Sequence, residues 1–284
     1  MLSRFDYVRP QVLQDALTYL EQNAGTKILA GGTDLMVMLR RNAEMPEHVL
    51  DIKALPETKR FEYKPQEGLY IGASVTVNQV AEADFIKEKY AAIAQAADSL
   101  ASYQLRNRAT LVGNICNASP GADLSGPLLI YGAKVHIANV EGGRTVDINE
   151  FFTGVKKTVL KQGELVIGVS IPDVASGDAG IYLKRTRVKG HDLGIAGVAM
   201  RLTADKKVVV AMSAVAPTPI RLTKLEEFIN SKPLTAETAA LAGEEVRKII
   251  KPISDVRSSA EYRLHVSGVM VKRALTQLMA RGGK

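Results

Sequence analysis

Residues 29–35, with the sequence LAGGTDL, could bind an anion through their backbone. Glycines let backbone N–H groups approach a ligand closely, and a helix N-terminus favours negative charge. Thr33 adds a hydroxyl donor. The spacing is neither G-x-G-x-x-G nor that of a P-loop, whose lysine is missing. The alternative is a tight turn between a strand and a helix, in which Thr33 or Asp34 is only the N-cap.

Residues 106–123 combine small residues, amides and hydroxyls beside a stretch, 110–112, that we expect to be strand-like. Such a segment is poor at forming a core but can present several hydrogen-bonding groups to a polar ligand. The alternative is an elaborate loop held by Asx turns. The groups that could contact a ligand are the hydroxyls of Thr110 and Ser119, the amides of Asn114 and Asn117, the open backbone of Gly113 and the carboxylate of Asp123.

Two polar, glycine-bearing segments in neighbouring small units suggest one extended ligand between them, most simply a dinucleotide. Its diphosphate needs backbone donors, whereas its rings need shape and a few side-chain contacts. The sequence shows no catalytic triad, carboxylate pair or metal-ligand spacing, and its four histidines are scattered. We therefore expect no catalytic residue and no metal site, but a protein that holds a redox cofactor.

Cys116 is the only cysteine, so an internal disulfide is excluded and an iron–sulfur site built from this chain's thiolates is implausible. It lies within the second segment and could have a redox role. Free cysteines are more often small buried hydrophobic residues, and that reading is favoured.

The elements that must position these segments follow an α/β order. Over the first 56 residues we expect strands at 3–8, 27–30 and 49–52, with helices between them. Residues 57–68 are expected to be a linker or hairpin entering a second unit, which ends near 175. Three strands followed by three helices, the last near 260–280, then form a third unit. The predicted domains are 1–56, 57–175 and 176–284.

Composition and charge exclude several classes of protein. Hydrophobic residues make up 46% of the 284, which excludes a disordered chain. The net charge of +7 would suit an anionic cofactor or acidic partner, but with 5% aromatic residues and no tryptophan a nucleic-acid-binding module is disfavoured. No apolar run approaches the roughly 18 residues of a membrane span, and no signal peptide is visible. We therefore expect a cytoplasmic protein.

Four stretches resemble the medium, FAD-binding subunit of the molybdenum hydroxylases, a family that includes xanthine dehydrogenases and aerobic carbon monoxide dehydrogenases. They are AGGTDL (30–35), NRATLVGNICNASPGADL (107–124), ELVIGVSIP (164–172) and YLKRTR (182–187). The resemblance implies an α+β fold class, with a two-part FAD-binding domain of the vanillyl-alcohol-oxidase (PCMH) type followed by a C-terminal α+β domain.

The resemblance also implies a set of FAD-binding residues. One group wraps the diphosphate, a second lines the other half of the site, Asp123 anchors a polar part of the cofactor, and Ile167 and Lys184 lie near the flavin. The first group is Lys27, Ile28, Leu29, Ala30, Gly31, Gly32, Thr33 and Asp34, and the second is Thr110, Gly113, Asn114 and Asn117.

Two features depart from the family. Val112-Gly113 stands where two glycines are common, and the β-branched Val112 does not easily adopt a positive φ. With Cys116 alone, the chain cannot hold the iron–sulfur cluster that some relatives carry in this subunit.

Three further groups have two readings each beside the flavin. Tyr103 either approaches the flavin or only packs. The basic stripe of Lys184, Arg185 and Arg187 is either a solvated edge or a source of one cation near the flavin. His191-Asp192 is either a surface turn or part of a flap.

As such a subunit, the chain would pair with a molybdopterin-binding large subunit and a [2Fe–2S] small subunit, as a dimer of heterotrimers. FAD would take electrons from the small subunit and pass them to NAD, a quinone or another acceptor. The alternative is a stand-alone FAD-dependent oxidoreductase, which would need a catalytic base or covalent flavin anchor that the segments lack. Nucleic acid is not an expected partner.

Overall fold

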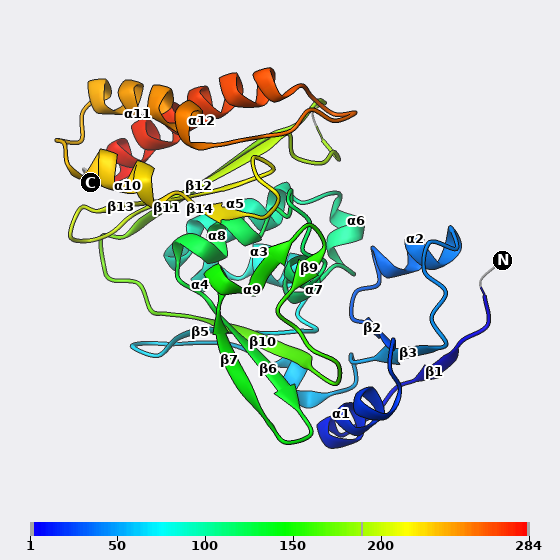
Figure 1. Cartoon of the computed structure of the whole chain (residues 1–284). Coiled ribbons are helices and arrows are strands. Elements are labelled where there is room, and N and C mark those ends of the chain that lie inside the picture. The colour runs from blue at the N-terminus through cyan, green and yellow to red at the C-terminus, as the bar shows by residue number, and fades with distance from the viewer. Residues whose placement is uncertain (1–2, 189, 283–284) are drawn as a thin grey trace.

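The computed structural model describes residues 3–188 and 190–282, and its elements form three successive layers (Figure 1). The first layer, in blue, is a three-stranded parallel sheet of order β1-β3-β2, here the N-terminal sheet. The predicted β-α-β-α-β order is confirmed. The spacing of Ala16, Leu17 and Leu20 explains the first helix, since all three are buried on one face. The elements are β1 (Asp6–Val8), α1 (Leu13–Gln22), β2 (Lys27–Leu29), α2 (Leu35–Arg40) and β3 (His48–Asp51).

The second layer is the central sheet, with order β4-β5-β10-β6-β7 and antiparallel neighbours. Residues 57–68, expected to be a linker or hairpin, contain a 3₁₀ turn and then strand β4, which forms a hairpin with β5. The strands are β4 (Phe61–Lys64), β5 (Gly68–Gly72), β6 (Lys134–Asn139), β7 (Gly142–Asp147) and β10 (Leu165–Ile171), with a small pair β8 (Phe152–Gly154) and β9 (Lys157–Thr158) beside them.

Short helices connect and cover the central sheet. Thr76 caps α3 in a capping box with Gln79. The helices are η1 (Pro56–Lys59), α3 (Val77–Glu82), α4 (Asp84–Lys89), α5 (Ala91–Ser99), α6 (Tyr103–Arg106), α7 (Leu111–Cys116), α8 (Ser125–Ile130) and α9 (Ile148–Phe151).

The strand-like stretch expected at 110–112 is wrong, because helix α7 begins at Leu111. The Thr110 hydroxyl accepts a hydrogen bond from the Gly113 backbone N–H (3.0 Å) and caps the helix. The intrinsic propensities of Thr110, Leu111 and Val112 favour a strand, but the Thr110 hydroxyl at the N-cap stabilises a helix instead. Val112 and Gly113 therefore lie inside a helix, and the concern about a positive φ at Val112 does not apply.

The third layer is the C-terminal sheet, with order β11-β12-β13-β14. Helices α11 and α12 cover one face, and α5 and α8 of the second layer cover the other (Figure 1). Side chains alternate accordingly. Val198 and Met200 belong to the core under α12, whereas Ala199 between them belongs to the core of the second layer. The elements are β11 (Ala179–Arg185), β12 (Ala196–Leu202), β13 (Val208–Ser213), β14 (Ile220–Arg221), α10 (Thr223–Asn230), α11 (Ala236–Ile249) and α12 (Ala260–Gly282).

Helix α12 packs within its own layer. Val271 and Leu275 are fully buried against the C-terminal sheet and α11, while Val269 is only partly buried. The apolar residues on the buried face of this helix therefore form core and are not free to dock a partner.

This packing predicts the effect of truncating Leu275. Leu275→Ala removes a fully buried side chain and should lower the free energy of unfolding by about 2–5 kcal/mol. Gln277→Ala, on the exposed face of the same helix, should change it by less than about 0.5 kcal/mol. Urea unfolding of the isolated chain measures both. Equal small effects would show that Leu275 does not stabilise the folded monomer.

Candidate cofactor site

The segment that joins β2 to α2 presents free backbone donors. Among the described residues, none accepts a hydrogen bond from the backbone N–H groups of residues 31–34. Gly32 has φ +76°, a conformation that glycine adopts without strain. Asp34 stands at the N-cap of α2 but makes no capping hydrogen bond with its side chain. Consecutive unpaired N–H groups in a tight turn form a concave site for an anion.

Gly31 brings this segment against the second one. A Cβ added to Gly31 would lie 2.0 Å from the Arg108 carbonyl oxygen and 2.9 Å from the Ala109 Cα. Only a residue without a side chain allows that approach. The next carbonyl, of Ala109, accepts a hydrogen bond from the Val77 N–H (2.8 Å), which fixes the second segment to α3. The two sequence segments are thus side by side, where Figure 1 shows β2 and α2 beside α6 and α7.

Helix α7 carries the amides of the second segment. The Asn114 Oδ1 accepts a long hydrogen bond from the Leu124 N–H (3.4 Å), and the Asn117 Oδ1 accepts one from the Lys156 ammonium (2.7 Å). Neither amide nitrogen donates to a protein group in the described part of the chain, so both remain available to a ligand. Gly113 serves the helix cap, because a Cβ there would lie 2.8 Å from the Thr110 hydroxyl oxygen.

Arg106 holds the start of this segment and was missed by the sequence reasoning. It is buried, and its guanidinium donates to the Asn78 Oδ1 (2.9 Å) and to the carbonyls of Asp98 and Leu100. The only sequence signal for this role of Arg106 is its position at the start of a polar segment.

Asp123 and Lys184 form a buried ion pair between the second and third layers. The Lys184 ammonium lies 2.8 Å from the Asp123 Oδ2 and also donates to the Ser99 carbonyl (3.2 Å). The other oxygen of Asp123 accepts a hydrogen bond from the Tyr182 hydroxyl (2.8 Å). Burial raises the pKa of Asp123, while the charge of Lys184 opposes that rise. Lys184 is therefore not part of a solvated edge, and both oxygens of Asp123 already have protein donors.

Ile167 lies at an irregularity of β10, where the pairing with β6 shifts between Val166 and Gly168. Its carbonyl accepts a hydrogen bond from the Ala73 N–H (2.9 Å), and its side chain is partly buried against the main core. Helix α7 packs on this strand, which places Ile167 in the same layer as the second segment.

Burial raises the pKa of the Cys116 thiol to about 12, so it holds its proton at neutral pH and a redox role is disfavoured.

Tyr103 is 53% exposed, and the Arg106 guanidinium lies 5.9 Å from its ring centre.

His191-Asp192, which we expected to be either a surface turn or part of a flap, lies just after Lys189, which is outside the described residues. Within the described part, Asp192 pairs with Arg187 (2.9 Å), and His191 is exposed.

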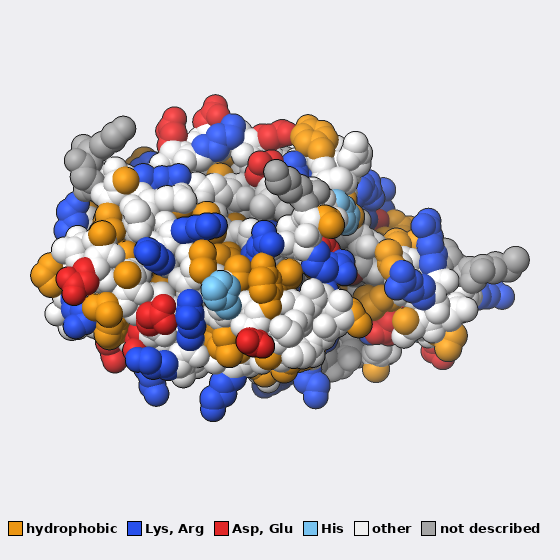
Figure 2. Space-filling view, turned by 90° about the horizontal axis from the view of Figure 1, so that it is seen from above, with side chains coloured by type: hydrophobic (Ala, Val, Ile, Leu, Met, Phe, Trp, Pro, Cys, Tyr) orange, Lys and Arg blue, Asp and Glu red, His pale blue; other side chains and the backbone are white. Residues whose placement is uncertain are grey.

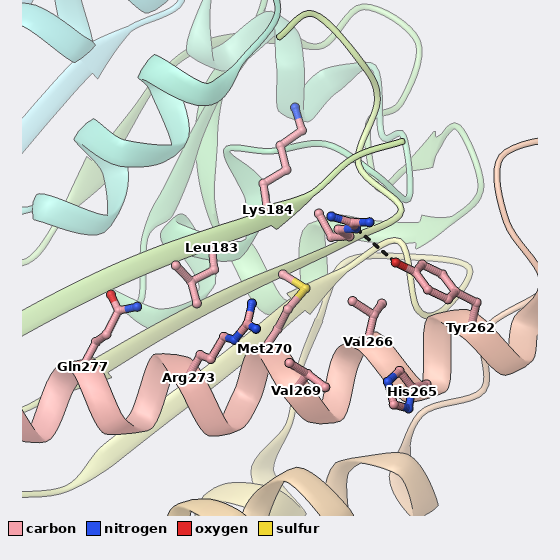
Figure 3. A pocket seen from close by; sticks show the side chains of 10 residues that line it. Leu183, Lys184, Tyr262, His265, Val266, Val269, Met270, Arg273 and Gln277 are labelled. Atoms are coloured by element: carbon pink, nitrogen blue, oxygen red, sulfur yellow. Dashed lines mark hydrogen bonds between the residues drawn. The ribbon is translucent and has the colours of Figure 1, made fainter. Parts of the chain in front are cut away.

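A groove of about 480 Å³ lies on the other side of β11, against α12 (Figure 3). Leu183 points toward α12, whereas the Lys184 ammonium points away from it, as successive side chains of a strand do. Arg185 donates to the Tyr262 hydroxyl in this groove (3.1 Å). Lys184 therefore also lines this groove, but its ammonium points away from α12 and pairs with Asp123.

The face above α11 and α12 carries lysine and arginine side chains that are scattered among hydrophobic ones rather than gathered in one patch (Figure 2). Among the described residues, no group of three His, Cys, Asp or Glu side chains could hold a metal ion. Within the same residues, no helix is both long and apolar enough to cross a membrane.

Comparison with known proteins defines the class. Residues 3–174 match the FAD binding domain in molybdopterin dehydrogenase, and residues 181–278 match the CO dehydrogenase flavoprotein C-terminal domain. The chain is therefore a flavoprotein, and the predicted fold class, FAD cofactor and oxidoreductase activity are confirmed.

Individual relatives agree with these domains over nearly their whole length. The chain is 33% identical to the xanthine dehydrogenase FAD-binding subunit of Escherichia coli O157:H7, covering 98% of this chain and 97% of the relative. It is 32% identical to the carbon monoxide dehydrogenase medium chain of Hydrogenophaga pseudoflava, covering 98% of each. A solved structure of that organism's carbon monoxide dehydrogenase superposes with a TM-score of 0.94, at 30% identity and 99% coverage of both chains. The chain belongs to the FAD-binding medium subunits of the molybdenum hydroxylase family.

The buried Asp123–Lys184 pair predicts unequal effects of its two single variants. Asp123→Asn leaves the Lys184 ammonium buried without its carboxylate and should cost about 3–5 kcal/mol of unfolding free energy. Lys184→Met should cost less, because burial already favours a protonated Asp123.

The double variant Asp123→Asn/Lys184→Met removes both charges and should be more stable than Asp123→Asn alone. Urea unfolding of the FAD-free chain measures the whole cycle. A double variant that is less stable than Asp123→Asn would contradict the explanation that an uncompensated buried charge destabilises Asp123→Asn.

Proposed function

We propose that the diphosphate of FAD binds the free backbone N–H groups of residues 31–34 and that the flavin half extends along α7 toward Lys184. The observation that carries this proposal is the row of unpaired donors beside the second segment, joined to it at Gly31. A diphosphate is the part of FAD that requires several such donors. A mononucleotide would need only one of the two segments.

Each part of the site has its own task in this proposal. Strand β2 holds the donor loop in place, the free amides of Asn114 and Asn117 bind polar groups of the cofactor, and Ile167 provides an apolar contact. Asp123 fixes the Lys184 ammonium, whose charge would favour an anionic reduced flavin. The proposed cofactor-binding residues remain Lys27, Ile28, Leu29, Ala30, Gly31, Gly32, Thr33, Asp34, Thr110, Gly113, Asn114, Asn117, Asp123, Ile167 and Lys184.

Within a complex, the chain would act as an electron-transfer subunit. FAD supplies chemistry that accepts electrons singly and releases them in pairs. We propose a [2Fe–2S] small subunit as the electron donor, a molybdopterin-binding large subunit as the site of substrate oxidation, and a dimer of heterotrimers as the assembly. NAD, a quinone or another acceptor would receive the electrons. The names of the relatives, a FAD-binding subunit and a medium chain, support a multi-subunit complex.

The domain division 1–56, 57–175 and 176–284 is part of the same proposal, supported by the separate sheets and by the limits of the two domain matches. The cytoplasmic location stays a prediction.

Gly32→Val should weaken FAD binding by about 10²- to 10⁴-fold. A branched side chain at φ +76° is strained, and loss of two charge-assisted hydrogen bonds would cost roughly 3–6 kcal/mol. Gly25→Val is the matched control, because Gly25 has φ +77° with open space around it and lies before β2. Flavin fluorescence titration of the apoprotein measures both. Equal affinities in the two folded variants would mean that residues 31–34 are only a turn.

The isolated chain should bind FAD but oxidise no substrate by itself. Among its described residues there is neither a metal-ligand cluster nor a cysteine set for iron–sulfur chemistry. After reconstitution, chromatography of the released flavin should show FAD rather than FMN, and an artificial donor should reduce it. Turnover of a purine, aldehyde or N-heterocycle at about 1–10³ s⁻¹ without added subunits would favour the stand-alone oxidoreductase.

A further inference from the structure

The side chain of Lys53, two residues after β3, contacts the proposed diphosphate loop that follows β2. Strands β2 and β3 are parallel, with Leu29 opposite Asp51, so the segments that follow both strands meet at one edge of the N-terminal sheet. There the Lys53 ammonium lies 2.8 Å from the Asp51 Oδ1 and 3.1 Å from the Ala30 carbonyl oxygen. Lys53 stands outside both glycine-bearing segments.

Asp51 anchors the Lys53 side chain. Its side chain is 4% exposed, and its carboxylate accepts hydrogen bonds from the Tyr7 hydroxyl (2.5 Å) and the Lys53 backbone N–H (2.9 Å). Burial alone would raise the pKa of Asp51, but the bonds from Lys53 and Tyr7 hold it below its ordinary value. The carboxylate is therefore ionised and fixed at neutral pH, and it fixes the Lys53 ammonium in turn.

The contact with Ala30 determines where the next N–H points. In a trans peptide the C=O and the following N–H point in opposite directions, so an Ala30 carbonyl held by Lys53 turns the Gly31 N–H away from the lysine. Gly31 has no side chain to restrict its backbone. The Gly31 N–H is the first of the four unpaired donors.

We propose that Lys53, anchored by Asp51 and Tyr7, is a positioning residue that sets the orientation of the Ala30–Gly31 peptide for diphosphate binding. This rests on the proposed function. Lys53 acts through the loop, since its ammonium is engaged by Asp51 and the Ala30 carbonyl. FAD affinity would thus depend on Lys53 through the loop that it holds.

The first test measures ADP and FAD binding to the full-length apoprotein by calorimetry. ADP carries the diphosphate but no flavin. Lys53→Met should weaken both ligands by about 10- to 100-fold, because a hydrogen bond from a charged group is lost. Lys53→Arg, which can still donate to both oxygens, should restore most of the affinity. The matched control is Lys248→Met, which breaks the exposed Lys248–Glu245 pair on α11 (2.7 Å) and should change neither affinity.

A second variant separates positioning from simple charge attraction. If Lys53 only attracted phosphate through space, Asp51→Asn would remove an opposing negative charge and tighten ADP binding. If Lys53 positions the loop, the same change releases the lysine and weakens ADP binding. Tyr7→Phe should produce a smaller loss in the same direction, because Asp51 keeps its bonds to Lys53. Tighter binding by Asp51→Asn would overturn the proposal.

The Gly31 amide resonance gives a readout that does not depend on affinity. Its chemical shift in the free protein should change in Lys53→Met and return in Lys53→Arg, while thermal melting confirms that each variant is folded. A wild-type chain that binds neither ADP nor FAD would contradict the proposed function itself. A wild-type chain that binds them as tightly as Lys53→Met, with an unmoved Gly31 resonance, would overturn this inference alone.

Discussion

The structure depends on the direct contact of two backbones, at Gly31 and at Arg108–Ala109. No side chain fits between them, so the N-terminal sheet meets the second layer at that spacing only while residue 31 is glycine. Because of this contact, a loop after a parallel strand lies beside the segment that leads into the helix capped by Thr110, although the two are almost eighty residues apart in sequence. In the proposed function, the free N–H groups of residues 31–34 and the amides of α7 bind one extended cofactor.

A second constraint joins the other two layers. The C-terminal sheet is apolar on both faces, with larger side chains such as Met200 toward α12 and small ones such as Ala199 toward α5 and α8. The small residues let helices of the second layer come close, and Gly126 of α8 lies against Ala199. In this closely packed region Asp123 and Lys184 can form an ion pair with little solvent. The pair is therefore a consequence of the packing and could not exist on a separate C-terminal unit.

Much of this arrangement could be predicted from local sequence. The helix expected between the first two strands is α1, and the two glycine-bearing segments were identified by composition alone. The strand expected at 110–112 was wrong because a single hydroxyl at Thr110 outweighs β propensity there. Contacts between residues far apart in the sequence could not be predicted. Nothing near Lys53 indicates that its partner is a carbonyl 23 residues earlier, and nothing near Asp123 indicates a tyrosine at 182.

The Asp123–Lys184 pair has a consequence for the order of events during synthesis. Asp123 and the N-terminal sheet leave the ribosome before β11, which carries Lys184, and β11 is held in place by β12 and α12, the last helix of the chain. A flavin site that includes Lys184 is thus complete only when the final third of the chain has folded. Cofactor loading would then act as a late checkpoint, so that a chain truncated before α12 carries the diphosphate loop without a finished flavin pocket.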